Sequence, residues 1–152
     1  MQLAEMLARE AIRKTLGIYN FAVDRADFDA LSTVFHPDAT IAIQGGATIQ
    51  GIDAIIKSLR GGSRSGSAFR DGRFQRHHLT SSLIELIDDD SASGDHYVLV
   101  VTELGFDHSG RYLDRYVRHG ERWLIQHRAA SMEWARPDSR FVRWLGAGKP
   151  TG

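Results

Sequence analysis

A stripe of apolar residues at helical spacing predicts a first helix over residues 4–23. The stripe consists of Ala8, Ile12, Leu16, Tyr19 and Val23. A shorter helix is expected over residues 27–35, because Pro37 cannot continue a helix. A third helix is expected over residues 52–59, between Gly51 and the glycine pair at 61–62.

The pattern changes to that of strands in the second half of the chain. A short strand is expected over residues 40–43, and longer ones over 77–87, 96–104, 111–118 and 122–131, followed by a tail. The apolar run 97–101 predicts a strand buried on both faces. Residues 61–76 are rich in glycine and serine and have no period, so we expect a loop that borders the binding site.

Helices followed by long strands predict an α+β fold, with a curved antiparallel sheet wrapped around the N-terminal helices. The 152 residues suit a single domain over residues 1–152. A sheet curved in this way encloses a cavity that suits a small ligand.

Composition excludes several classes of protein and site. The absence of cysteine rules out disulfides, thiolate metal sites and a cysteine nucleophile. The formal net charge is zero and no basic stripe stands out, so no nucleic-acid partner is expected. No apolar run approaches the roughly 20 residues that cross a bilayer, and the N-terminus lacks a signal-peptide core, so we expect no membrane contact and a cytoplasmic location.

The sequence has no motif typical of phosphate binding, of zinc proteases or of a serine nucleophile elbow. Outside the pair at 77–78, the histidines have no metal-ligand spacing; they are His36, His96, His108, His119 and His127. We therefore expect neither a metal nor another cofactor.

Six segments, in this order along the chain, resemble the SnoaL-like family of the nuclear transport factor 2-like superfamily. They are Tyr19–Leu31, Phe35–Thr40, Gly51–Ile55, His77–Ser81, Gly110–Tyr116 and Trp123–Arg128. The resemblance covers about residues 5–131 and implies a cone-shaped α+β fold. The family includes dehydratases, dehydrochlorinases, isomerases, polyketide cyclases and proteins without known activity, so the fold alone names no reaction.

The resemblance implies an acid–base pair of Asp24 and His77, because several metal-independent lyases of the superfamily use an aspartate and a histidine at these places. A neutral imidazole can take a proton near pH 7, since its ordinary pKa is about 6.5. A carboxylate behind it fixes the tautomer. Thr80 fits the threonine that follows the family's histidine, which selects His77 over His78; neighbours on a strand point to opposite faces. Without the resemblance, both residues are equally well explained as polar ends of a helix and a strand.

Tyr19 and Arg128 complete the candidate site. In related dehydratases a tyrosine at the first place helps to hold or protonate a leaving oxygen, although a core tyrosine would fit the sequence equally well. In a related dehydrochlorinase an arginine at the second place assists the departing anion, a task that suits a permanently charged guanidinium. The alternative for Arg128 is a structural ion pair with Asp114. Alternation along the last strand places Arg128 on one face with Leu124, Gln126 and Ala130.

We therefore expect a cofactor-independent lyase or isomerase that acts on a small hydrophobic or aromatic substrate in an enclosed pocket, with dehydration ahead of polyketide-type cyclisation. The alternative is a non-catalytic small-molecule-binding or accessory protein, similar to the small subunits of ring-hydroxylating dioxygenases. An apolar outer sheet face needs cover, which members of the family generally supply by self-association, so we expect a homodimer or homotrimer.

Overall fold

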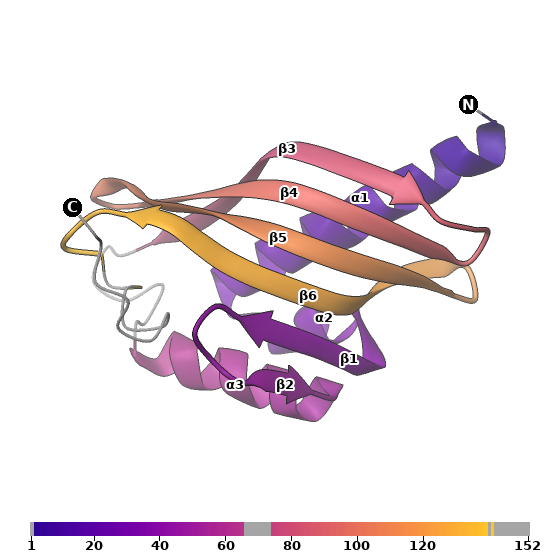
Figure 1. Cartoon of the computed structure of the whole chain (residues 1–152). Helices are drawn as coiled ribbons and strands as arrows, with labels where there is room; N and C mark the ends of the chain where they lie inside the picture. Colours follow the sequence, from indigo (N-terminus) through magenta and orange to yellow (C-terminus); the bar gives the residue numbers. More distant parts are fainter. Residues whose placement is uncertain (1, 66–73, 140, 142–152) are drawn as a thin grey trace.

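The computed structural model describes residues 2–65, 74–139 and 141, and these residues form one curved sheet with helices packed against it (Figure 1). The helices are α1 (Leu3–Arg25), α2 (Phe28–Ser32) and α3 (Ile52–Ser65). The strands are β1 (Phe35–Ile43), β2 (Thr48–Gln50), β3 (Gln75–Leu86), β4 (Ser91–Thr102), β5 (Gly105–His119) and β6 (Arg122–Ala135). The predicted α+β class is confirmed.

The sheet has the strand order β2-β1-β6-β5-β4-β3, so β3 forms one edge. The long strands β3 to β6 form the antiparallel meander that the sequence predicts. The pairing of β1 with β6 is parallel, which the prediction of a purely antiparallel sheet missed. Figure 1 shows α1 crossing one face of the meander, which places its last turn near the start of β3.

Several predicted boundaries are wrong around Pro37. The second helix ends at Ser32, and the segment expected to break it lies inside β1. Pairing between β1 and β6 shifts register between Phe35 and Thr40, so Pro37 falls where no ladder partner needs its missing N–H. Strand β2 was not predicted, and β6 extends through Trp134, which was expected in the tail. Of the predicted loop over residues 61–76, the ends belong to α3 and β3, while residues 66–73 lie outside the described residues.

The core lies between α1 and the inner face of the sheet. The predicted stripe of α1 is the face that packs, with Ile12, Leu16 and Tyr19 buried. Strand β4 does not bury both faces, because its burial alternates strictly along the strand and Tyr97 is exposed. This alternation fixes which side chains of β4 can reach the interior.

The outer face of the meander exposes large apolar side chains. These are Tyr97, Phe106, Leu113 and Trp134. The rings of Phe106 and Trp134 stack with centroids 5.1 Å apart. None of the helices in the described part of the chain is long and apolar enough to span a bilayer.

Self-association through this outer face is the first testable expectation. Light scattering of the wild type should give two or three times the chain mass of 17.0 kDa. Leu113→Lys should shift the mass toward that of one chain, because a charge cannot be buried there without a partner. The control is Leu7→Lys, which changes an exposed leucine on α1 and should leave the mass unchanged. A monodisperse wild-type monomer at micromolar concentration would contradict the expectation.

Candidate functional site

Asp24 and His77 lie in direct contact where the last turn of α1 meets the start of β3. Nδ1 of His77 is 2.6 Å from Oδ1 of Asp24. The backbone N–H of His77 also donates to the same carboxylate, at 3.0 and 3.2 Å from its two oxygens. The carboxylate therefore holds both the backbone and the ring of His77, which fixes the direction of the imidazole.

The geometry assigns the ring hydrogen of His77. An ionised carboxylate can only accept hydrogen bonds, so Nδ1 carries the hydrogen. The lone pair is then on Nε2, which becomes the nitrogen able to take a proton from a ligand. Its neighbour His78 is exposed while the side chain of His77 is largely buried, although both histidines border the groove between α1 and β3.

A groove of about 430 Å³ runs between α1 and β3 beside this pair. Its walls mix apolar and polar side chains, among them Leu16, Asn20, Phe21 and Leu79. Oδ1 of Asn20 is buried and has no hydrogen-bond partner among the described residues. The described residues leave the groove open along one side, so they do not by themselves form the enclosed pocket that was expected.

Arg128 lies in the interior, in the ion pair with Asp114 that was the structural alternative for it. Its side chain is 1% exposed and binds Asp114 through two hydrogen bonds, Nε to Oδ1 at 2.8 Å and Nη2 to Oδ2 at 2.6 Å. The guanidinium carbon lies 4.1 Å from the ring centroids of both Tyr19 and Tyr112. Nη1 has no partner in the described part of the chain, so one nitrogen of the charged guanidinium has no acceptor for its N–H groups.

The surroundings keep Arg128 charged. Burial by itself would lower the pKa of Arg128, but the charge and hydrogen bonds of Asp114 hold this pKa well above its ordinary value. Burial also raises the pKa of Tyr112, with Tyr19 adding to the effect. The interior therefore holds a fixed cation against the rings of Tyr19 and Tyr112, and neither Arg128 nor Tyr19 is among the residues that line the groove beside His77.

A buried hydrogen-bond chain extends from this ion pair toward the groove. The Tyr116 hydroxyl donates to Oδ2 of Asp114 at 2.7 Å and lies 2.8 Å from Nε2 of His96. Nδ1 of His96 lies 2.9 Å from the Ser82 hydroxyl, at the groove wall. A Cβ on Gly94 would collide with His96 and Tyr116, so glycine leaves the room for their contact. Burial lowers the pKa of His96, and its nearest charges, Asp114 and Arg128, act in opposite directions.

The sequence interpretation missed His96 and misplaced part of the last strand. Strict alternation along β4 puts His96 on the inner face with Val98 and Val100, and this signal was present in the sequence. On β6, a register shift between the pairs of Arg115 and Tyr116 brings Ile125 to the inner face opposite Tyr116. The expected alternation of Arg128 with Leu124 and Gln126 is therefore wrong. Ala130, which pairs opposite Tyr112, does lie on the same face as Arg128.

No three His, Asp or Glu side chains within the described ranges are grouped so that they could hold a metal ion. The site consists instead of a histidine–carboxylate pair at a groove and a buried, charged guanidinium between two tyrosines. In sequence comparisons, the SnoaL-like domain matches residues 4–129. The chain belongs to the SnoaL-like family.

Solved structures support the same fold. A putative scytalone dehydratase from Novosphingobium aromaticivorans superposes with a TM-score of 0.77 at 21% identity, covering 90% of this chain and 91% of that one. LinA gives a TM-score of 0.74 at 21% identity, with 87% and 90% covered. ActVI-ORFA from Streptomyces coelicolor gives 0.70 at 18% identity, with 82% and 96% covered. At these identities the likeness shows the fold alone, and comparison with curated proteins finds no match.

The buried ion pair predicts that replacing Asp114 by alanine destabilises the protein much more than replacing the exposed Asp95. Asp114→Ala should lower the free energy of unfolding by about 3–5 kcal/mol, because it leaves Arg128 charged and uncompensated in the interior. Asp95→Ala removes the partner of Arg111 in a pair whose side chains are 36% and 39% exposed, and should cost at most about 1 kcal/mol. Urea unfolding of both variants checks this, and equal losses would show that the interior pair is not specially stabilising.

Proposed function

We propose that this SnoaL-like protein is a cofactor-independent lyase of the dehydratase type, with His77 as its base. The observation that carries the proposal is the 2.6 Å contact between Nδ1 of His77 and Asp24, together with the backbone bonds to the same carboxylate. This arrangement presents Nε2 as the acceptor for a carbon-bound proton. Positioned bases of this kind typically contribute about 10²–10⁴-fold to a rate.

The proposed step is an elimination in which one histidine moves one proton. Nε2 of His77 takes a proton from a carbon of the substrate, and the electrons of that C–H bond form the new double bond. The C–O bond on the neighbouring carbon breaks, and the oxygen leaves as water after His77 returns the proton to it. Asp24 stabilises the imidazolium that exists between the two transfers.

Arg128 and Tyr19 are proposed to stabilise negative charge on the substrate. The support is the unused Nη1 donor of a buried guanidinium, held in place by Asp114 and by the rings of Tyr19 and Tyr112. A fixed cation in a water-poor interior interacts strongly with charge that develops during a reaction. The role as ion-pair partner and the role in catalysis are compatible, because Asp114 engages only two of the guanidinium nitrogens.

The substrate class follows from the walls of the site. Most of the accessible wall surface is apolar, contributed by side chains such as Leu16, Phe21 and Leu79, although polar and charged side chains line the groove as well. Such a wall suits a small, largely hydrophobic molecule with a few polar groups. The same base could serve a cyclisation that begins by removing a carbon-bound proton, so a cyclase of the polyketide type uses the same residues.

The base can be tested before the natural substrate is known. The probe is 5-nitrobenzisoxazole, a small aromatic molecule whose ring opens to a coloured phenolate when a base removes its carbon-bound proton. The wild type should accelerate this reaction, and His77→Ala should lower the rate about 10²–10⁴-fold. Asp24→Asn should also lower it strongly, and the double variant should lose little more, because the two residues act as a unit.

His78→Ala tests the adjacent histidine, which is exposed and also borders the groove, but does not contact Asp24 in the way His77 does. Its rate should equal that of the wild type. If His78→Ala abolishes the reaction while His77→Ala does not, the role of base passes to His78. If the wild type shows no acceleration, the chain is better explained as a binding protein.

A further inference from the structure

His108 lies on the same sheet face as His77, two strands away. Val100 pairs with His77 on one side and with His108 on the other, so the three residues stand in one row across β3, β4 and β5. Neighbouring strands are about 4.8 Å apart, so the two histidine Cα atoms are separated by about 10 Å. A molecule with one or two rings can span that distance.

A β-bulge gives His108 a carboxylate partner from the adjacent position. Val100 pairs with His108 and Val101 with Phe106, so Asp107 is the extra residue between two successive pairs. Adjacent residues on a regular strand point to opposite faces, but the bulge lets both side chains turn together. Nδ1 of His108 lies 2.7 Å from Oδ1 of Asp107, so the second histidine is held in the same way as the first.

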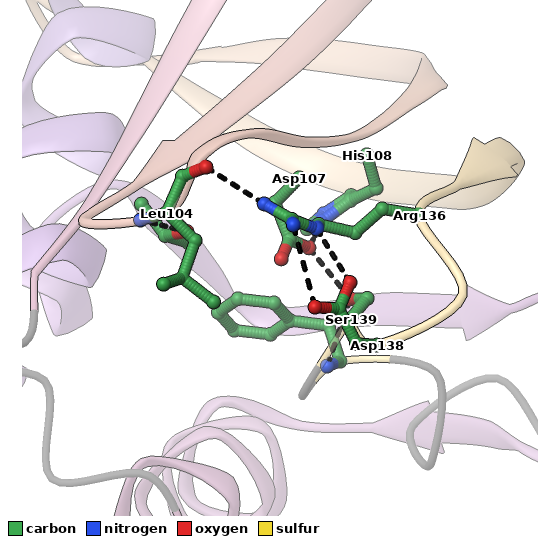
Figure 2. Close-up of polar contacts among 8 residues, drawn as sticks. Leu104, Asp107, His108, Arg136, Asp138 and Ser139 are labelled. Carbon is green, nitrogen blue, oxygen red and sulfur yellow. Dashed lines mark hydrogen bonds and ion pairs between the residues drawn. The ribbon is translucent and has the colours of Figure 1, made fainter.

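The segment that follows β6 holds Asp107 in place (Figure 2). The hydroxyl of Ser139 donates to Oδ1 of Asp107 at 2.6 Å, and the backbone N–H of Arg136 donates to the carbonyl oxygen of Asp107 at 2.8 Å. The guanidinium of Arg136 also donates to the carbonyl oxygen of Leu104 at 2.7 Å. Asp107 is therefore an acceptor fixed on two sides, and it sets the hydrogen of His108 on Nδ1.

His108 is neutral at neutral pH and presents a lone pair on Nε2. Burial lowers the pKa of His108, which outweighs the opposing bond and charge of Asp107, and a protonated His77 would lower it further. Nε2 makes no hydrogen bond to any residue in the described part of the chain. The side chain is only 12% exposed, but Nε2 itself retains some accessible surface, so a ligand can reach this acceptor.

A small apolar cavity adjoins His108. Its volume is about 150 Å³, and its walls include Val98, Tyr112, Met132 and Phe141. The ring of Phe141 lies 5.1 Å from that of His108. Like the groove beside His77, this cavity is open on one side. Its volume is about that of an apolar cavity that can hold benzene, so a single aromatic ring fits.

We infer that His108 forms a hydroxyl-binding subsite, in which Nε2 accepts a hydrogen bond from an alcohol or phenol whose apolar body fills this cavity. The inference rests on the proposed function in one respect: the same molecule would present its reacting C–H bond to His77. It narrows the substrate class to small hydroxylated molecules, because an ether or a hydrocarbon has no hydrogen to donate to Nε2 of His108.

The test compares phenol with anisole, which has the same ring but no hydroxyl hydrogen. Phenol should bind the wild type more tightly than anisole, and His108→Leu should weaken phenol binding about tenfold while changing anisole binding less than twofold. Affinities are measured by NMR titration. His119→Leu is the control, because it removes an exposed histidine from the same strand and should leave both affinities unchanged.

A direct observation in the unmodified protein covers the case in which His108→Leu fails to fold. In a long-range ¹H–¹⁵N spectrum, Nε2 of His108 should have the shift of an unprotonated nitrogen, and phenol but not anisole should move it. Equal responses to both ligands, or none, would overturn the subsite. Because binding is measured without any reaction, this result is independent of the ring-opening test, and an inactive His77 would leave the subsite intact.

Discussion

The ion pair between Arg128 and Asp114 is the interaction on which the arrangement of α1 against the sheet depends. It joins β5 to β6 by two charge-assisted hydrogen bonds, and the guanidinium also lies against Tyr19, which comes from the helix. Removing two charges from water is costly, and the cost is offset only when geometry and further hydrogen bonds are good. The Tyr116 hydroxyl supplies one such bond to Asp114 and extends the network to His96. The same residues thus stabilise the interior and keep a cation there.

The sequence could predict those parts of the fold that follow from the periodic spacing of apolar residues along one segment. The stripe of α1 and the long strands of the meander follow from spacing alone, because each repeats over three or more turns or pairs. The parallel pairing of β1 with β6 depends on residues far apart in the chain, and no local pattern specifies it. Pro37 misled the interpretation because its effect depends on whether a ladder partner is present, and the register shift removes that partner.

The candidate site likewise contains residues that the sequence could place and residues that it could not. Asp24 and His77 were located through the resemblance to the family, and the structure brings them into contact, while their catalytic role stays a prediction. His96 could have been placed inside by alternation along β4. His108 could not be paired with Asp107 by the same reasoning, because regular alternation separates neighbours and only the bulge brings them together. Irregular pairing is decided by the whole sheet, so the second pair becomes visible only in three dimensions.

The bonds made by Arg136 and Ser139 have an evolutionary consequence. Both residues, and Phe141 with them, lie beyond the stretch that the SnoaL-like domain matches, which ends at residue 129. Part of the wall of the small cavity, and the residues that anchor Asp107, thus lie outside the stretch that the domain matches. Descendants of this chain could acquire or lose a ligand preference by exchanging a few residues after β6, while the helix, the meander and the Asp24–His77 pair stay as they are.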